Sequence, residues 1–463
     1  MPTDMTLSFR LFMRLLMPIA VLYGVLPVAA QPFVTRPCKE EIRSLRLRYA
    51  DGSLERPVLT LGADGTIDGS DPHNTLDISF DCLGHDIRHY TCSLMLLNRD
   101  GMPADPASYD YLRGFTTADI TDYTLSSGTQ QIYTHYAFQF PNADMVLTRS
   151  GNYVLHIYED GNPDNRVAEV CFLVAEPLAG ISATVRPNTG MELNGRFQQL
   201  DISIDTRHLP GCHADEITLV VSQNERTDNT AVITRPTFVE PSRLRYENQN
   251  ALIFEGGNEY RHLDIYSVYF AGWNVDRVLF DRGEYHAFLE PDENRGVTAV
   301  TGPTGAPYLS ADDNNGQFVI NAERTDDTDT EADYMWVHWS FPMEQPFFDG
   351  AVYVGGDLFQ NRLTINNRMI YDNERHCYYL NALLKQGAYD YQYLFLPKER
   401  SGGPDRQTGL LPVRTDTPPC EQGATLLRTE GSHWETENRY AVYVWYRPFG
   451  ERADRLVGYG IFR

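Results

Sequence analysis

Alternation of polar and apolar residues recurs along the chain, and this pattern constrains the fold most strongly. It is clear in residues 45–49, 76–80 and 200–204, where every second side chain is apolar. Such a period of two places apolar side chains on one face of a strand and polar side chains on the other. No run of 12 or more residues shows the apolar spacing of a helix. We therefore expect an all-β protein of half-buried antiparallel strands with few, short helices.

The length of 463 residues corresponds to three domains of roughly 150 residues each. A Gly-x-Tyr sequence precedes an expected strand three times, ending at Tyr153, Tyr285 and Tyr389. In immunoglobulin-like sandwiches a tyrosine that enters a late strand closes a corner between the sheets. We interpret the three copies as three antiparallel sandwiches in series, although chance co-occurrence in so tyrosine-rich a chain is the alternative.

Turn-rich and acidic stretches suggest where these domains begin and end. Glu176 and Pro177 punctuate the end of the first unit, and residues 296–316 are rich in Gly, Pro, Asn and Asp. These residue types favour turns over regular strands. We predict a first β-sandwich at residues 31–176, a second with a loop-rich end at 177–328, and a third at 329–463.

The first thirty residues have the pattern of an export signal. Arg10 and Arg14 precede an apolar stretch at residues 15–28, and small residues lead up to Ala30. This arrangement is typical of a cleaved signal peptide, residues 1–30. A retained membrane anchor needs about 18 to 25 apolar residues, and this stretch is shorter and interrupted by two prolines. We expect an exported mature chain with no transmembrane segment.

Composition argues against two broad classes of protein. The chain has 39 Lys and Arg against 63 Asp and Glu, a formal charge of −24. Such a charge repels phosphate backbones, so a nucleic-acid partner is not expected. The hydrophobic content of 42% is too high for a disordered chain.

Seven cysteines could form three disulfides with one thiol left over in an oxidising compartment. Cys82 and Cys92 flank a turn and could face each other across adjacent strands. The alternative is that the cysteines are unpaired thiols that pack as small apolar side chains. The spacing does not decide between these possibilities, and no CxxC motif is present.

Common catalytic motifs are absent from the sequence. It contains no GxSxG, GxxxxGK[ST] or HExxH, and no GxGxxG after a strand. His85 and His89 lie between expected strands, where a spacing of four does not form a metal site as it would on a helix. The acidic stretches at 160–165 and 326–331 suit solvated turns better than calcium loops. We predict no catalytic residue, no cofactor and no metal ligand.

Two strands carry rows of aromatic residues that could stack on sugars or on a partner. One row comprises Tyr389, Tyr391, Tyr393 and Phe395, and the other lies within residues 440–446. Packing in the core and across strands explains most such rows, so we interpret them as structural.

The third predicted domain has a recognisable order of segments. Residues 334–342, 352–361 and 385–393 resemble the early-set sandwich of glycogen-binding and amylase-associated modules. Those modules place a sugar-stacking Trp just after the Asn that matches Asn361, but here an arginine and a leucine follow. Tyr378 or Tyr379 is the only candidate for a second platform aromatic. The resemblance implies the fold more strongly than sugar binding, and a periplasmic glycan-binding protein is the alternative function.

Short segments in all three units carry a second resemblance. These segments are 111–115, 120–123, 133–136, 140–142, 150–153, 256–264, 289–292, 330–334, 446–450 and 454–459. In these segments, collinear over about residues 36 to 462, the mature chain resembles the plug proteins of the type IX secretion system of Bacteroidetes-type bacteria. The resemblance implies a periplasmic, non-enzymatic protein that sits against the periplasmic mouth of the outer-membrane translocon barrel. It would close the pore when no substrate is in transit.

One loop is our predicted point of contact with that barrel. Two consecutive glycines give its backbone freedom, and the following residues display polar and aromatic recognition groups. The predicted contact residues are Gly257, Asn258, Glu259, Tyr260, Arg261 and His262. The alternative is an internal turn in which Arg261 and Asp264 pair structurally.

Overall fold

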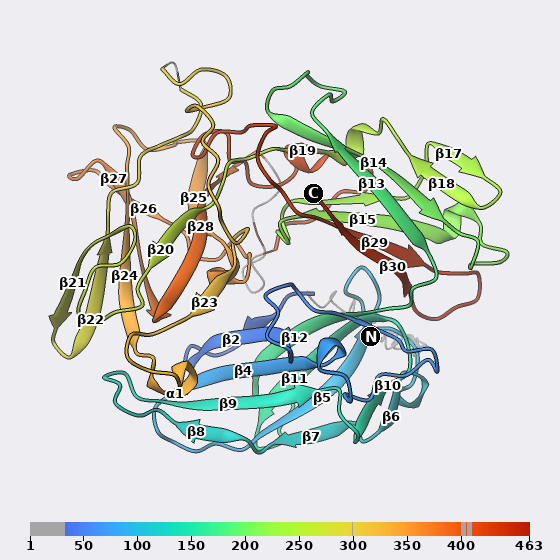
Figure 1. Cartoon of the computed structure of the whole chain (residues 1–463), viewed down its shortest axis with the longest axis horizontal. Coiled ribbons are helices and arrows are strands. Elements are labelled where there is room, and N and C mark those ends of the chain that lie inside the picture. The colour runs from blue at the N-terminus through green and yellow to red at the C-terminus, as the bar shows by residue number, and fades with distance from the viewer. Residues whose placement is uncertain (1–32, 299, 400–403, 405–409) are drawn as a thin grey trace, which may run out of the picture.

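The chain forms three β-sandwiches arranged around a common centre (Figure 1). The computed structural model describes residues 33–298, 300–399, 404 and 410–463. In this part of the chain the one α-helix, α1 (Thr328–Glu331), is a single turn. The expected all-β fold with antiparallel sheets is confirmed. The predicted signal peptide, residues 1–30, lies outside the described residues.

The first sandwich follows the sequence closely. One sheet has the strand order β1 (Arg36–Pro37), β12 (Arg166–Ala175), β11 (Gly151–Glu159), β5 (Tyr90–Leu97) and β7 (Thr117–Ile120), with β3 (Val58–Thr60) parallel to β12. The facing sheet has the order β2 (Ile42–Tyr49), β4 (Leu76–Leu83), β9 (Tyr133–Phe140) and β8 (Tyr123–Leu125). A small pair, β6 (Leu112–Gly114) and β10 (Met145–Leu147), lies beside them. Their inward-facing apolar residues form one core.

The second sandwich combines residues from two distant parts of the chain. One sheet has the order β13 (Gly180–Arg186), β14 (Phe197–Asp205), β18 (Arg243–Tyr246) and β17 (Phe238–Glu240), with β19 (Ile253–Glu255) also on β14. The other has the order β16 (Thr230–Ile233), β15 (Ile217–Gln223), β29 (Tyr440–Tyr446) and β30 (Arg455–Phe462). The C-terminal hairpin therefore completes this sandwich.

The third sandwich lies between these two parts in the sequence. One sheet has the order β21 (Val275–Asp281), β22 (Glu284–Leu289), β24 (Tyr334–Pro342), β27 (Cys377–Lys385) and β26 (Ile370–Asp372), in which β22 and β24 are parallel. In the other, β28 (Gly387–Pro397) pairs with β20 (Arg261–Asp264), β23 (Phe318–Ile320) and β25 (Gly350–Gly355). A separate core lies between the two sheets.

Strand pairing corrects two of the predicted domain bounds. In the first sandwich the last strand, β12, ends at Ala175, and the next strand, β13, opens the second sandwich. The bounds 177–328 and 329–463 do not follow the strand pairing, because β20 to β23 belong to the third sandwich while β29 and β30 return to the second. The described residues of the turn-rich stretch at 296–316 form a loop within the third sandwich. Alternation along a strand does not reveal which distant strand that strand pairs with.

The aromatic rows are structural, as expected. Tyr389, Tyr391 and Tyr393 lie in the core of the third sandwich, and Tyr440 lies in the core of the second. On the opposite face of β29, Trp445 and its neighbours belong to an apolar cluster that joins the first and second sandwiches.

The Gly-x-Tyr sequences mark corners in two of the three sandwiches. The hydroxyl of Tyr153 donates a hydrogen bond to the carbonyl of Arg149, 2.7 Å away, in the first sandwich. Tyr389 makes the same bond to the carbonyl of Lys385 in the third. Tyr285 lies on β22 in the third sandwich, so the expectation of one copy for each sandwich is wrong.

Cys82 and Cys92, for which pairing was one of two alternatives, form no disulfide with each other. Cys82 and Cys92 are separate buried thiols in the core of the first sandwich. Cys38, Cys212 and Cys377 are also free thiols. The packing of Cys82 and Cys92 agrees with the alternative of small apolar side chains.

Candidate functional site

The predicted contact segment, residues 256–262, connects β19 of the second sandwich to β20 of the third. It is largely buried: Asn258 and Glu259 are each 4% exposed. A Cβ on Gly256 would lie 1.9 Å from the carbonyl oxygen of His433, and Gly257 has a φ of +69°. Only glycine accommodates this approach and this backbone, so the two glycines serve the close packing of the chain on itself.

Polar groups in this segment have partners within the protein. The side-chain amide of Asn258 donates to the carbonyl of Glu430 at 2.8 Å. The amide of Gln392 donates to the carbonyl of Asn258 at 2.6 Å. The Tyr308 hydroxyl donates to the carboxylate of Glu259. These bonds satisfy groups that would otherwise be costly to bury.

Arg261 is an ion-paired structural residue. Its guanidinium lies 2.9 Å from Asp292 and 3.0 Å from Glu430, over the ring of Tyr393 at 5.3 Å. Burial alone would lower the pKa of Arg261, but the carboxylates of Glu430 and Asp292 raise it above its ordinary value. The structure therefore favours the internal-turn alternative, with Asp292 and Glu430 as partners in place of the expected Asp264.

The far end of the segment reaches an open groove of about 470 Å³. Tyr260, Arg261 and His262 form part of its lining. The remaining lining residues are Trp273, Asn274, Asp292, Ala311, Asp312, Asp313 and Asn314. The side chain of His262 is 35% exposed, and its Nδ1 lies 2.8 Å from the buried carboxylate of Asp390. The hydrogen bond to Asp390 raises the pKa of His262.

Negative charge exceeds positive charge at this groove. The cations are Arg261, Arg295 and His262, and the carboxylates at or directly beneath the lining are Asp292, Asp312, Asp313, Asp390 and Glu430. Burial raises the pKa of Asp313 to about 6, although its carboxylate accepts hydrogen bonds from the backbone of Tyr260 and Asn315. Asp312 is exposed and forms no ion pair with the described residues.

Exposed aromatic side chains lie on the loop at residues 265–274, which we name the aromatic loop and of which Trp273 and Asn274 line the groove. Tyr269 is 65% exposed, Phe270 57% and Trp273 73%. The hydroxyl of Ser267 accepts hydrogen bonds from the backbone of Tyr269 and Phe270 and donates to Glu323. The loop is thus held in place while its aromatic rings face solvent. The strand patterns and motifs of the sequence did not point to this loop.

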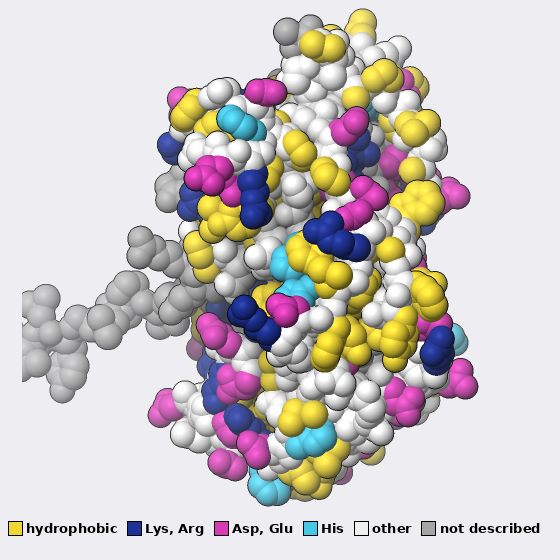
Figure 2. Space-filling view, turned by 90° about the vertical axis from the view of Figure 1, so that its left-hand side faces the viewer, with side chains coloured by type: hydrophobic (Ala, Val, Ile, Leu, Met, Phe, Trp, Pro, Cys, Tyr) yellow, Lys and Arg dark blue, Asp and Glu magenta, His cyan; other side chains and the backbone are white. Residues whose placement is uncertain are grey.

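The outer face of the β21–β22–β24–β27–β26 sheet is also partly apolar. Phe288 stacks on His338 with ring centroids 4.3 Å apart, and the guanidinium of Arg277 lies 4.5 Å from the Phe288 ring. Leu279 is 46% exposed and Ile370 59%. Figure 2, which views the side where β21 and β22 lie in Figure 1, shows apolar side chains gathered around histidine and arginine.

The two candidates for a sugar-platform aromatic, Tyr378 and Tyr379, lie on opposite faces of β27. Tyr378 is 5% exposed, packs in the core and accepts a hydrogen bond from the backbone of Phe347 at 2.7 Å. Tyr379 is its neighbour on the same strand and so points to the opposite face. Tyr378 is therefore not available to stack on a sugar, whereas Tyr379 faces away from the core and stays a candidate.

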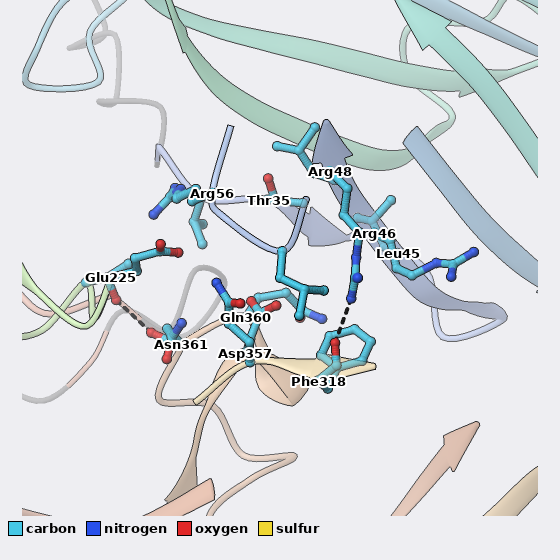
Figure 3. A pocket seen from close by; sticks show the side chains of 15 residues that line it. Thr35, Leu45, Arg46, Arg48, Arg56, Glu225, Phe318, Asp357, Gln360 and Asn361 are labelled. Carbon is cyan, nitrogen blue, oxygen red and sulfur yellow. Dashed lines mark hydrogen bonds between the residues drawn. The ribbon is translucent and has the colours of Figure 1, made fainter. Parts of the chain in front are cut away.

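A small cavity of about 90 Å³ lies where the three sandwiches meet (Figure 3). Arg48 and Arg56 come from the first sandwich, Glu225 from the second, and Phe318 and Asp357 from the third. Arg48 donates to the carbonyl of Phe318 at 2.6 Å. This cavity has room for water only, and we assign it to the contact between sandwiches.

The first and third sandwiches also meet at a buried ion pair. The ammonium of Lys385 lies 2.7 Å from the carboxylate of Asp81, and both side chains are almost fully buried. His135 and Tyr334 bind the same carboxylate at 2.6 and 2.8 Å. Such a satisfied network fixes the relative position of the two sandwiches.

Across the described residues, no group of three or more His, Cys, Asp or Glu is placed to hold a metal ion. Among the helices in this part of the chain, none is long and apolar enough to span a bilayer.

Comparisons with known proteins identify the family. The family model for the first domain of the type 9 secretion system plug protein matches residues 42–176, which form most of the first sandwich. A crystal structure of a hypothetical protein from Parabacteroides merdae ATCC 43184 is similar, with 30% sequence identity and a TM-score of 0.82. The similarity covers 93% of this chain and 99% of the other. No curated protein matches the chain. The chain belongs to the type IX secretion system plug protein family.

Proposed function

We propose that this protein is a non-enzymatic periplasmic plug that binds the periplasmic mouth of the type IX outer-membrane translocon and closes its pore. The observation that carries the proposal is the family match over the first sandwich. That match already supports a role associated with type IX secretion, in a family not known for enzymes. The family also suggests a periplasmic location near the outer membrane.

Rigid contacts between the sandwiches suit a protein that blocks an opening. An apolar cluster that includes Leu173 and Trp445 joins the first sandwich to the second. The Asp81–Lys385 pair joins the first to the third. Glu430, in the segment that leads back to the second sandwich, binds Arg261 of the third. Contacts at all three junctions let the chain resist displacement as one body.

We further propose that the aromatic loop and the groove beside it form the contact with the translocon. A stable interface buries roughly 800 Å² on each partner and is enriched in exposed aromatic residues at its centre. Tyr269, Phe270 and Trp273 supply such residues. Of the six residues predicted from sequence, His262 offers the groove a partly exposed side chain. The buried members of that segment would support this surface from behind.

A pull-down from the outer membrane of a type IX-secreting bacterium tests the proposal. The full chain, tagged and expressed in that host, should recover the large translocon barrel from detergent extracts. A secreted reporter should leak or stall when the gene is deleted. Recovery of no large barrel by a tagged chain that is stable and exported would contradict the proposal.

A further inference from the structure

We propose that the groove binds a cationic side chain, an arginine or a lysine, from an extended segment of its protein partner. This inference rests on the proposed function, because it gives the chemistry of the partner at the proposed contact surface. The groove is lined by residues of the third sandwich and by one exposed indole, that of Trp273.

Charge complementarity is the first argument for this occupant. Five carboxylates lie at or beneath the groove and only three cationic side chains accompany them, so a net negative charge remains even when His262 is protonated. Most of these groups bind one another, but Asp312 is exposed and unpaired among the described residues. A cation placed here gains attraction without first breaking an internal ion pair.

The carboxyl group of Asp313, in the wall of the groove, has a pKa that reflects the same excess of negative charge. Burial is the main cause that raises its pKa to about 6, and the nearby carboxylates of Asp390 and Glu259 raise it further. The two backbone donors that bind Asp313 do not offset these effects. A cation in the groove would favour the ionised form of this carboxyl group.

The shape and the aromatic wall favour a side chain over a bare ion. A groove of about 470 Å³ holds a long side chain with part of its backbone. The indole of Trp273 is the best aromatic partner for a guanidinium or an ammonium. Trp273 belongs to the aromatic loop, whose other exposed rings, Tyr269 and Phe270, add apolar surface to the same loop.

Other occupants fit less well. A metal ion would need several converging ligands, and no group of three such residues is placed for one within the described chain. A second copy would bring a surface from a chain of charge −24 to a negative groove. A sugar could stack on Trp273 but would leave the excess negative charge uncompensated.

Peptide binding tests the assignment directly. The probe is a fluorescein-labelled glycine–serine peptide with two arginines, compared with a twin in which citrulline, which has the same shape without charge, replaces each arginine. We expect the full mature chain to bind the arginine peptide, measured by fluorescence anisotropy, at least about tenfold more tightly than the citrulline twin. Equal affinity for the two peptides would overturn the inference.

Two variants locate the binding in the groove. Trp273→Ala removes the indole, and Asp312→Asn removes one charge with little change of shape. We expect each to weaken binding of the arginine peptide several-fold. The matched controls on the first sandwich, Tyr109→Ala and Asp164→Asn, alter an exposed aromatic and an exposed acid and should bind as the unaltered chain does. Unchanged binding by both groove variants would overturn the inference.

Further probes address the rival occupants. Tighter binding of Ca²⁺ or maltose than of the arginine peptide, abolished by Trp273→Ala, would overturn the assignment to a cationic side chain. So would a dimer in sedimentation that this variant abolishes.

The inference and the proposed function can fail separately. If the chain recovers the translocon barrel but does not bind the arginine peptide, the inference falls and the proposed function stands. If the peptide binds as expected but no barrel is recovered, the proposed function falls, while the preference of the groove for a cationic side chain stands.

Discussion

Two neighbouring segments of the third sandwich differ sharply in environment. Residues 256–262 carry glycines, polar groups and a tyrosine. They nevertheless pack against residues 430–433, and their polar groups bind partners within the protein. The aromatic loop, residues 265–274, begins three residues later and exposes three aromatic rings. Residue types that suit recognition therefore serve to join two sandwiches in the first segment, whereas the second presents apolar surface to solvent. The predictions below test this contrast.

The largest effect is expected at the ion pair of the buried segment. Arg261→Met leaves Asp292 without its ion-pair partner and Glu430 with Arg295 alone, and breaking a buried pair on one side costs about 3 to 5 kcal/mol. Urea denaturation should show this loss in the transition of the third sandwich. The matched control Arg282→Met, at a side chain that is 90% exposed, should change stability by less than about 0.5 kcal/mol. Similar small losses of stability for both variants would contradict the difference between the two segments.

A smaller loss is expected where the backbone packs most closely. Gly256→Ala places a methyl group 1.9 Å from the carbonyl oxygen of His433, so the two segments must move apart. Overpacking of this kind costs about 1 to 3 kcal/mol. Gly180→Ala, at an exposed glycine whose Cβ would meet only Asp205, is the control. If thermal unfolding is as little affected by Gly256→Ala as by the control, the segment is not tightly packed.

The pH dependence of stability should show a modest contribution from His262. Asp390 raises the folded-state pKa of His262, so the stabilisation is fully present below pH 6.5 and is lost as the pH rises through that raised pKa. Because the side chain is partly exposed, we expect about 1 kcal/mol or less. His262→Gln should reduce the difference in melting temperature between pH 5.5 and pH 8.5, values chosen to lie about one to two pH units either side of an ordinary histidine pKa. An equal reduction by His208→Gln, at an exposed histidine, would rule out this cause.

The smallest effect on stability is expected in the aromatic loop. Trp273→Ala removes a ring that is 73% exposed, so the free energy of unfolding should change by less than about 0.5 kcal/mol. Denaturant midpoints for this variant and the unaltered chain check the prediction. A loss as large as that of Gly256→Ala would show that the loop serves packing and not recognition.

Local patterns predicted the strands but not their distant partners. Alternation at 45–49, 76–80 and 200–204 gave strands that lie in the observed sheets. The pairing of β29 with β15 was missed because it depends on how two separate stretches pack, which neither stretch encodes alone. The corner at Tyr153 was found because its bond to Arg149 is local.

The candidate site was predicted only in part. The sequence directed attention to residues 257–262, three of which line the groove. Their burial could not be foreseen, because it depends on Glu430 and His433, far along the chain. The exposed loop carried a local signal, Gly272 and Asn274 around Trp273, since both residue types favour turns, which lie at the surface.

Barrel recovery by a loop variant tests the central claim most directly. Full-length tagged chains, unaltered or carrying Phe270→Ala with Trp273→Ala, would be expressed in a type IX-secreting host that lacks its own copy. At equal amounts of folded, exported protein, the unaltered chain should recover the translocon barrel and the variant should recover several-fold less. Equal recovery would contradict the account that the aromatic loop and its groove form the docking surface.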